Sequence, residues 1–353
     1  MASNQFMTLK DATSLNALYR PGSVGLVDAI INVAPELDII PGRIIPGTSY
    51  EASILTSLGS NLAFRGANSG VAFSAPSIDE KRFNTFPLDC QFSIDEAIII
   101  KSEGNGGSMS EVMTAHTSAG VRQKALSLGR QIYLGSLNDP NGPPGLADFL
   151  FTQRTQVDPR TGLKINQVVD AGGTIAGSCQ TIWFLKTGPQ GVHWLFGNGS
   201  GVILGPWVRL PGQPSPDSTT ANPRYQTAWK NNLFGYVGTS MAQIHAVGAI
   251  INVDVTNGTT TANGLWDDKL VAKLYSLFPI GLKPDIALCT QYAAYGLQTQ
   301  RTVSNFVDGS GAARDWTGSA ALVANFPTHL PTCGNIPLYV TDSITLGNQV
   351  ILN

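Results

Sequence analysis

The chain has 353 residues, a formal net charge of −2 at pH 7 and only 13% charged residues, about half the share found in ordinary soluble domains. This balance excludes a basic nucleic-acid-binding protein and a disordered chain swollen by its charge, and no apolar run reaches the roughly 18 residues of a membrane span. A surface with so few charges indicates that other subunits cover much of it.

Residues 1–40 are expected to form an extended arm. Short apolar clusters are interrupted there by prolines and glycines, which leave room for one short helix near residues 24–32. The segment Met1–Phe6 lacks the basic patch and apolar run of a secretory signal, so we expect synthesis inside the cell.

Residues 41–101 are expected to form a strand-rich section. From Phe86 to Asp95 apolar and polar residues alternate, which is the period of a half-buried strand. The segment 50–64 is its expected partner, with turn residues at 65–70 between them. Because an isolated hairpin is marginal in water, its apolar face must lie on another surface, in this chain or in a neighbour.

A long helix is predicted over residues 108–135. Ser108 and Glu111 have the spacing of a capping box at its start, Gly135 offers a stop, and its length would be roughly 38 Å. Gly120 and Gly129 inside it are expected to allow close packing or curvature. The expected apolar stripe consists of Val112, Ala115, Ala119, Leu126 and Tyr133.

The rest of the chain alternates between strands and short helices, which predicts a mixed α+β architecture. The segments 181–185 and 192–196 flank a five-residue turn and predict a hairpin. The further expectations are helices at 144–151, 265–278 and 291–301, a loop at 211–223, and strands at 233–255, 286–289 and 336–344.

No set of residues predicts catalysis, a cofactor or a metal site. The histidines have no second ligand or nucleophile at a recognised spacing, and the cysteines are far apart and predict buried free thiols. Asp267 and Asp268 fit the start of a helix better than an acid/base pair. The histidines are His116, His193, His245 and His329, and the cysteines are Cys90, Cys179, Cys289 and Cys333.

Several sequence patterns follow one another in a definite order. They are AFRGANSG at 63–70, TFPL at 85–88, SIDEAI at 93–98, VHW at 192–194, the stretch 233–252 and GNIPLYVTD at 334–342. With an arm, a long hairpin, one long helix and a mixed domain, this order resembles the HK97-fold major capsid proteins of tailed bacteriophages. The resemblance covers about residues 40–345.

The resemblance implies an α+β, HK97-like capsid fold with an N-terminal arm, an extended β-hairpin loop (E-loop), a long spine helix in a peripheral domain, and a mixed α/β axial domain. The implied ranges are 1–40 for the arm, 41–101 for the E-loop with its flanking strands, 102–254 for the peripheral domain with spine helix 108–135 and strands 181–254, 255–330 for the axial domain, and 331–353 for a C-terminal strand of the peripheral domain.

The resemblance also implies a function without enzymatic activity. The chain would self-assemble through pentamers and hexamers into an icosahedral head that encloses double-stranded DNA without sequence-specific binding, in the bacterial cytoplasm and then in the virion. Implied partners are a separate scaffolding protein and a portal, with a decoration protein left open, and neither a cofactor nor a membrane is implied. The expected assembly contacts are Arg65, Asn68, Glu80, Lys81 and Arg82 in the E-loop and Ser108, Glu111, Arg122, Lys124 and Arg130 on the spine helix.

Two alternatives stay open at this point. A bacterial nanocompartment shell protein has the same fold but encloses enzymes. A strand-rich secreted carbohydrate-binding protein or hydrolase is suggested only by the glycine content and by tryptophans that look exposed, namely Trp183, Trp194 and Trp207. The absence of a signal peptide and of paired carboxylates opposes the second alternative.

Overall fold

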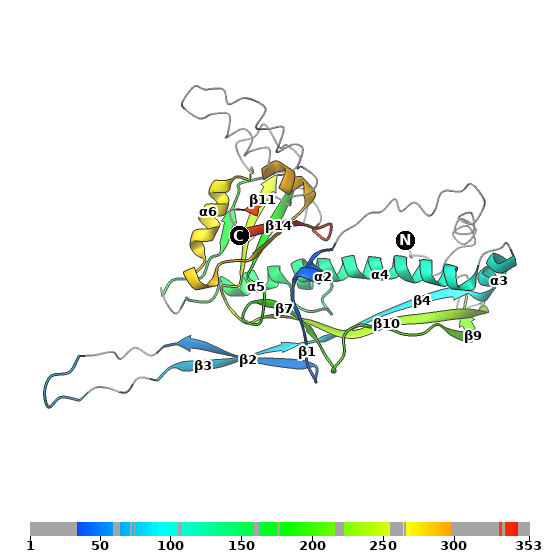
Figure 1. Cartoon of the computed structure of the whole chain (residues 1–353), viewed down its shortest axis with the longest axis horizontal. Coiled ribbons are helices and arrows are strands. Elements are labelled where there is room, and N and C mark those ends of the chain that lie inside the picture. Colours follow the sequence, from blue (N-terminus) through cyan, green and yellow to red (C-terminus); the bar gives the residue numbers. More distant parts are fainter. Residues whose placement is uncertain are drawn as a thin grey trace, which may run out of the picture.

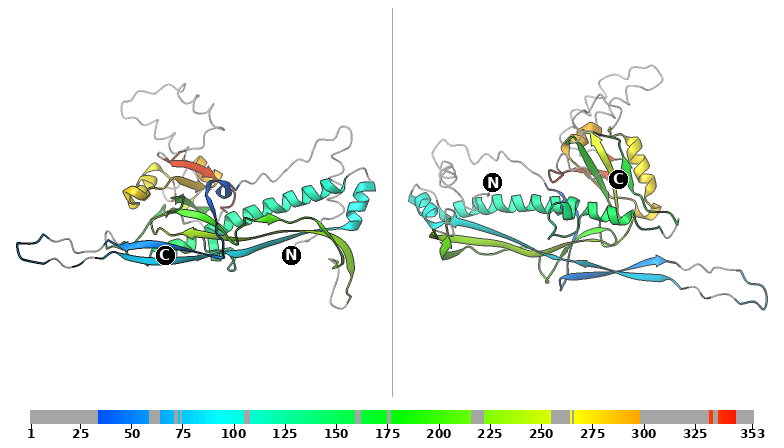
Figure 2. Two further views of the ribbon diagram at one scale, coloured as in Figure 1. Left: turned by 60° about the horizontal axis from the view of Figure 1, so that its bottom comes forward. Right: turned by 180° about the vertical axis from the view of Figure 1, so that it is seen from behind.

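A computed structural model describes most of the chain between residues 34 and 344. The described residues are 34–58, 64–70, 73, 75–104, 108–158, 162–174, 177–215, 222–254, 264, 266–297, 332–333 and 336–344. The helix expected near 24–32 lies outside these residues. The described part consists of an elongated layer, a compact sheet above one end of it, and a hairpin that projects away (Figure 1, Figure 2).

The elongated layer is a long helix lying on a six-stranded sheet (Figure 1). The helix, α4 (Met109–Leu134), runs along the two long strands β4 (Phe86–Asp95) and β10 (Tyr225–Met241). The strand order is β1-β7-β10-β4, and β8 and β9 also pair with β10. The shorter strands are β1 (Gly42–Ile44), β7 (Val192–Phe196), β8 (Ile203–Leu204) and β9 (Val208–Pro214).

Local sequence signals set both ends of α4, as predicted. The Ser108 side chain accepts a hydrogen bond from the Glu111 backbone N–H, and the Glu111 side chain accepts one from the Ser108 N–H. Gly135 ends the helix at φ 54°, a left-handed conformation that favours glycine. The 26 residues span about 39 Å. The predicted apolar stripe is correct at Val112 and Tyr133, which are buried, and wrong at Ala119, which is exposed.

The apolar face of β4 packs beneath α4, where Gly120 allows close contact. A Cβ atom at Gly120 would lie 2.1 Å from Cε1 of Phe92. The alternation from Phe86 to Asp95 therefore predicted the buried face correctly, but the predicted partner strand is wrong. β4 pairs antiparallel with β10, from Val237↔Phe86 to Ala228↔Asp95, because a partner far along the chain leaves no local signal.

The projecting hairpin is formed by β2 (Ser49–Ser57) and β3 (Ser77–Asn84). These strands pair with each other antiparallel from Ser49↔Asn84 to Ser57↔Ser77. The expected hairpin therefore exists, but β3 and not the Phe86–Asp95 strand completes it. A helix, α3 (Glu96–Gly104), follows β4 where the sequence indicated continued strand.

The compact sheet has six strands in the order β13-β14-β12-β6-β11-β5. Apolar side chains cover both of its faces. One face packs against α6 (Asp268–Leu277) and the helix at 291–297, and the other against α5 (Leu146–Gln153) and the end of α4. The strands are β5 (Val168–Asp170), β6 (Cys179–Leu185), β11 (Val247–Asp254), β12 (Ile286–Cys289), β13 (Thr332–Cys333) and β14 (Ile336–Val340).

The expected hairpin over 181–196 is wrong. β6 lies in the compact sheet and β7 in the elongated one, so the turn between them carries the chain from one sheet to the other. The compact sheet takes its strands from three of the implied domain ranges. Strands β5, β6 and β11, which fall within 102–254, share the compact sheet with β12 and with β14, which falls within 331–353.

Several smaller expectations are corrected. Trp183 and Trp194, which look exposed in the sequence, are 1% and 2% exposed and belong to the core. Trp207 is half-buried, and Val208–Pro214 is a strand although the sequence indicated a loop there. Cys179 and Cys289 are buried free thiols as expected, Cys90 is only half-buried, and the side chain of Cys333 lies outside the described residues.

Candidate assembly surfaces

In the part of the chain that the structure describes, no three His, Cys, Asp or Glu side chains gather closely enough to hold a metal ion. Among the described helices, none combines the length and apolar character of a bilayer crossing. Asp267 accepts a hydrogen bond from the Leu270 backbone N–H and so caps α6, as the sequence indicated. The most prominent candidate functional feature of the described residues is the surface of the projecting hairpin (Figure 1).

The outer part of the hairpin presents apolar side chains to solvent. Phe64 and Phe73, on either side of a described turn, are fully exposed at 104% and 102%. In this turn the Arg65 guanidinium donates to the Ser69 carbonyl oxygen at 3.2 Å, and Asn68 has φ 65°. Both residues expected at assembly contacts here, Arg65 and Asn68, thus shape the turn itself.

The root of the hairpin packs on the body of the chain. Phe83 of β3 is buried with Ile45 and Leu195, and Tyr50 of β2 packs against this cluster. The Arg43 guanidinium lies 4.7 Å from the centroid of the Tyr50 ring and donates to the Tyr50 hydroxyl at 3.0 Å. These contacts fix the base of the hairpin while leaving its outer part free of the body.

The hairpin residues expected at assembly contacts divide between two faces of β3. Glu80 and Arg82 are exposed, and Arg82 donates to Ser49 Oγ at 3.1 Å within the hairpin. Lys81 turns the other way, and its ammonium donates to the Met241 carbonyl oxygen at 3.2 Å. Of the three expected contact residues on β3, Glu80 and Arg82 face outward, and Arg65 and Asn68 in the outer turn are exposed as well.

The five residues expected on the spine helix do not form one cluster. Ser108 and Glu111 satisfy each other at the helix start, so their role in the fold is capping. Arg122 and Arg130 are exposed on α4, and Lys124 is half-buried near Cys90 of β4.

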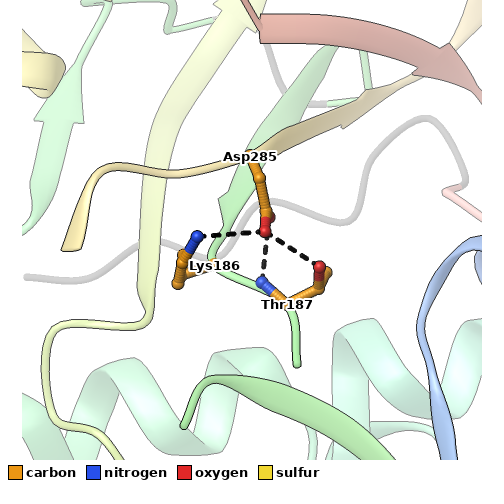
Figure 3. Close-up of polar contacts among 3 residues, drawn as sticks. All are labelled: Lys186, Thr187 and Asp285. Atoms are coloured by element: carbon orange, nitrogen blue, oxygen red, sulfur yellow. Dashed lines mark hydrogen bonds and ion pairs between the residues drawn. The ribbon is translucent and has the colours of Figure 1, made fainter. Parts of the chain in front are cut away.

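Two ion pairs tie distant segments of the chain together. Glu96, at the start of α3, accepts two hydrogen bonds from the Arg209 guanidinium at 2.6 and 2.9 Å. Asp285, just before β12, accepts from the Thr187 backbone N–H at 2.9 Å, the Thr187 hydroxyl at 3.0 Å and Lys186 Nζ at 3.3 Å (Figure 3). The Asp285 contacts hold the segment that crosses between the two sheets.

A buried carboxyl group joins three segments. Glu36 of α2 (Glu36–Ile39) is 0% exposed, and its Oε2 accepts from the Thr341 hydroxyl at 2.8 Å. A Cβ atom at Gly129 would lie 2.0 Å from Glu36 Oε1 and 2.3 Å from Ser343 Oγ, so this glycine makes room for the carboxyl group. Burial raises the pKa of Glu36, and neighbouring hydroxyl groups oppose that shift only in part.

Sequence reasoning missed Glu36 and Asp285. Glu36 is a lone acid beside Leu37, Ile39 and Ile40, and this apolar context is the one local sign that it is buried. Asp285 carries no comparable sign, because its partners lie about a hundred positions earlier in the chain.

Comparison with known proteins finds similarity at the level of structure. No family model and no curated protein sequence matches the chain. The described fold is similar to a chain in the structure of bacteriophage epsilon15, with a TM-score of 0.67 and 14% sequence identity over 100% of both chains.

Weaker similarities extend to other particles. The bacteriophage JBD30 capsid gives a TM-score of 0.44 at 10% identity, covering 81% of this chain and 86% of that one. The capsid of a native GTA particle gives 0.40 at 12% identity, covering 66% of this chain and 95% of that one. The chain has the HK97-like α+β fold that the sequence resemblance implied.

Proposed function

We propose that the chain is the major capsid protein of a tailed bacteriophage, a structural subunit that self-assembles through pentamers and hexamers into an icosahedral head around double-stranded DNA. The observation that carries the proposal is the structural similarity to a bacteriophage chain along the full length of both chains. A repeated head-to-tail contact of the kind a projecting hairpin offers generates rings and, with curvature, closed shells.

The two layers of the structure would correspond to the two domains of the implied capsid fold. The elongated layer of α4 on β4 and β10 would be the peripheral domain, and the compact sheet with α6 would be the axial domain near the five- and sixfold centres. This division follows the sheets and replaces the sequence ranges 102–254 and 255–330. The hairpin of β2 and β3 would be the E-loop.

The exposed tip of the hairpin supports self-association. Phe64 and Phe73 carry large apolar areas that a lone chain leaves in water, and burying each aromatic side chain against a neighbour would gain roughly 2 to 3 kcal/mol. The low charge of the chain fits subunits that cover one another. It also fits an inner wall that encloses DNA without many phosphate contacts, since such contacts would bind DNA tightly.

The proposal extends to location and partners. Shells would assemble in the bacterial cytoplasm and remain as the head of the virion, with a separate scaffolding protein and a portal as partners. No enzymatic step is assigned to the chain.

Negative-stain electron microscopy of the purified protein tests this function. Closed icosahedral particles or rings of five and six subunits are expected, and a chain that stays monomeric and binds a sugar or turns over a substrate would contradict the proposal. Particles that contain a protein cargo and no DNA would favour the nanocompartment alternative instead.

A variant of the hairpin tip tests the role of the E-loop. Phe64→Ser combined with Phe73→Ser should leave a folded subunit that no longer forms shells, whereas Ala75→Ser, an exposed position in the same loop, should assemble normally. Normal shells from the double variant would refute the assigned role of the tip.

A further inference from the structure

The hairpin of β2 and β3 is supported by the body only near its root. Phe83 is buried there, whereas Ser77, Ile78, Asp79 and Glu80 of β3 are all exposed. Lys81 is the outermost residue of β3 with a contact to the body, since its partners are the end of β10 and a ring of α5. The direction in which the outer hairpin leaves the body is therefore decided at Lys81.

Three contacts hold the Lys81 ammonium. It donates to the carbonyl oxygen of Met241, the last residue of β10, at 3.2 Å. It also lies 5.1 Å from the ring centroid of Phe149 on α5 and 5.4 Å from that of Phe83 on β3. A cation is attracted to the face of an aromatic ring at such distances, and a hydrogen bond from a charged donor is stronger than a neutral one.

The three contacts come from different elements. Phe83 belongs to the hairpin, Phe149 to α5 and Met241 to the elongated sheet. A single flexible side chain that binds all three fixes the angle between hairpin and body, because a rotation of the hairpin would break the contacts to Phe149 and Met241. Burial also lowers the pKa of Lys81, because the surrounding side chains displace part of the water around its ammonium.

We infer that Lys81 is a positioning residue that sets the direction of the hairpin relative to the body, and not a residue that contacts a neighbouring molecule. The adjacent Arg82 provides a contrast, because it lies on the exposed face of β3 and its hydrogen bond to Ser49 stays within the hairpin. The consequence for a shell rests on the proposed function, since the angle of the hairpin would decide where its tip reaches a neighbour.

Distance measurements on the unassembled chain test the inference. Spin labels attached through a keto amino acid at the exposed positions Ser53 on β2 and Ser118 on α4 avoid the native cysteines. Double electron–electron resonance then gives the distribution of distances between hairpin and body. Lys81→Met, which keeps the apolar stem but removes the charge and the donor, should broaden this distribution and shift its mean.

Two further variants complete the design. Lys81→Arg should keep the wild-type distribution because it retains the cation, and Arg82→Met should also keep it because Arg82 does not touch the body. If Lys81→Met does not yield folded protein, Phe149→Leu replaces it and should broaden the distribution through loss of the ring.

The outcomes separate the inference from the proposed function. An unchanged distribution in folded Lys81→Met, or an equal change in Arg82→Met, would overturn the positioning role whether or not shells form. A changed distribution in Lys81→Met alone would support the positioning role whether or not the wild-type chain forms shells, because the distances are measured on the unassembled chain.

Discussion

The contact between Gly120 of α4 and Phe92 of β4 predicts a loss of stability when a methyl group is added to the helix. In Gly120→Ala the new Cβ atom would lie 2.1 Å from Cε1 and 2.7 Å from Cδ1 of Phe92, far inside van der Waals contact. Phe92 is 5% exposed, and its ring packs edge-on against His116. The ring therefore has little room to withdraw.

The magnitude follows from two opposing effects. Overpacking a filled core costs roughly 1 to 3 kcal/mol, and the severe overlap at Gly120 places the cost at about 3 kcal/mol. Alanine is favoured over glycine inside a helix by about 1 kcal/mol. The expected net loss in the free energy of unfolding is therefore about 2 kcal/mol.

Denaturant unfolding of the unassembled subunit, followed by tryptophan fluorescence, measures this loss. A matched control is Gly296→Ala in the helix at 291–297, where a Cβ atom would meet nothing within 4 Å and no loss is expected. Adding Phe92→Leu to Gly120→Ala should recover part of the loss because the smaller side chain makes room. A Gly120→Ala chain as stable as the wild type would refute the close packing of α4 on β4.

Three further predictions concern Glu36, Ser108 and Asp285. Burial raises the pKa of Glu36 above its ordinary value of 4.5, so the stability contributed by its protonated carboxyl group is full below pH 4.5 and is lost as the pH rises through the folded pKa. Glu36→Gln should flatten this part of the plot of unfolding free energy against pH, measured by denaturant unfolding. An unchanged slope would contradict the buried site. Ser108→Ala should cost about 1 kcal/mol of stability through loss of the cap, whereas the exposed Ser110→Ala should cost nothing measurable in the same assay. Asp285→Ala should speed hydrogen exchange at the Thr187 amide, which bonds to it, and unaltered exchange measured by mass spectrometry would argue against that bond.

The features that sequence reasoning predicted correctly depend on neighbours along the chain. The capping box at Ser108 and the stop at Gly135 are signals within one turn of the helix, so both ends of α4 could be predicted. The alternation in β4 likewise revealed which face is buried. Such patterns report the local conformation and its solvent exposure.

The errors arise where a strand pairs with a segment that lies far away in the sequence. The turn at 187–191 has the composition of a hairpin loop, yet β6 and β7 enter different sheets. The contacts of Lys81 within the chain, to Met241 and Phe149, could not be predicted either, because both partners lie far away in sequence. Pairing and side-chain direction at such sites depend on the whole fold.

The path of the chain through the two sheets has a consequence for biosynthesis. The compact sheet takes its strands from before β7 and β10 and again from after them, and β14 lies between β13 and β12. A ribosome therefore releases β5 and β6 long before their sheet can be completed. The elongated layer, in contrast, has all of its strands once β10 has been synthesised, so it can fold first, whereas the compact sheet must wait until β14 has emerged from the ribosome.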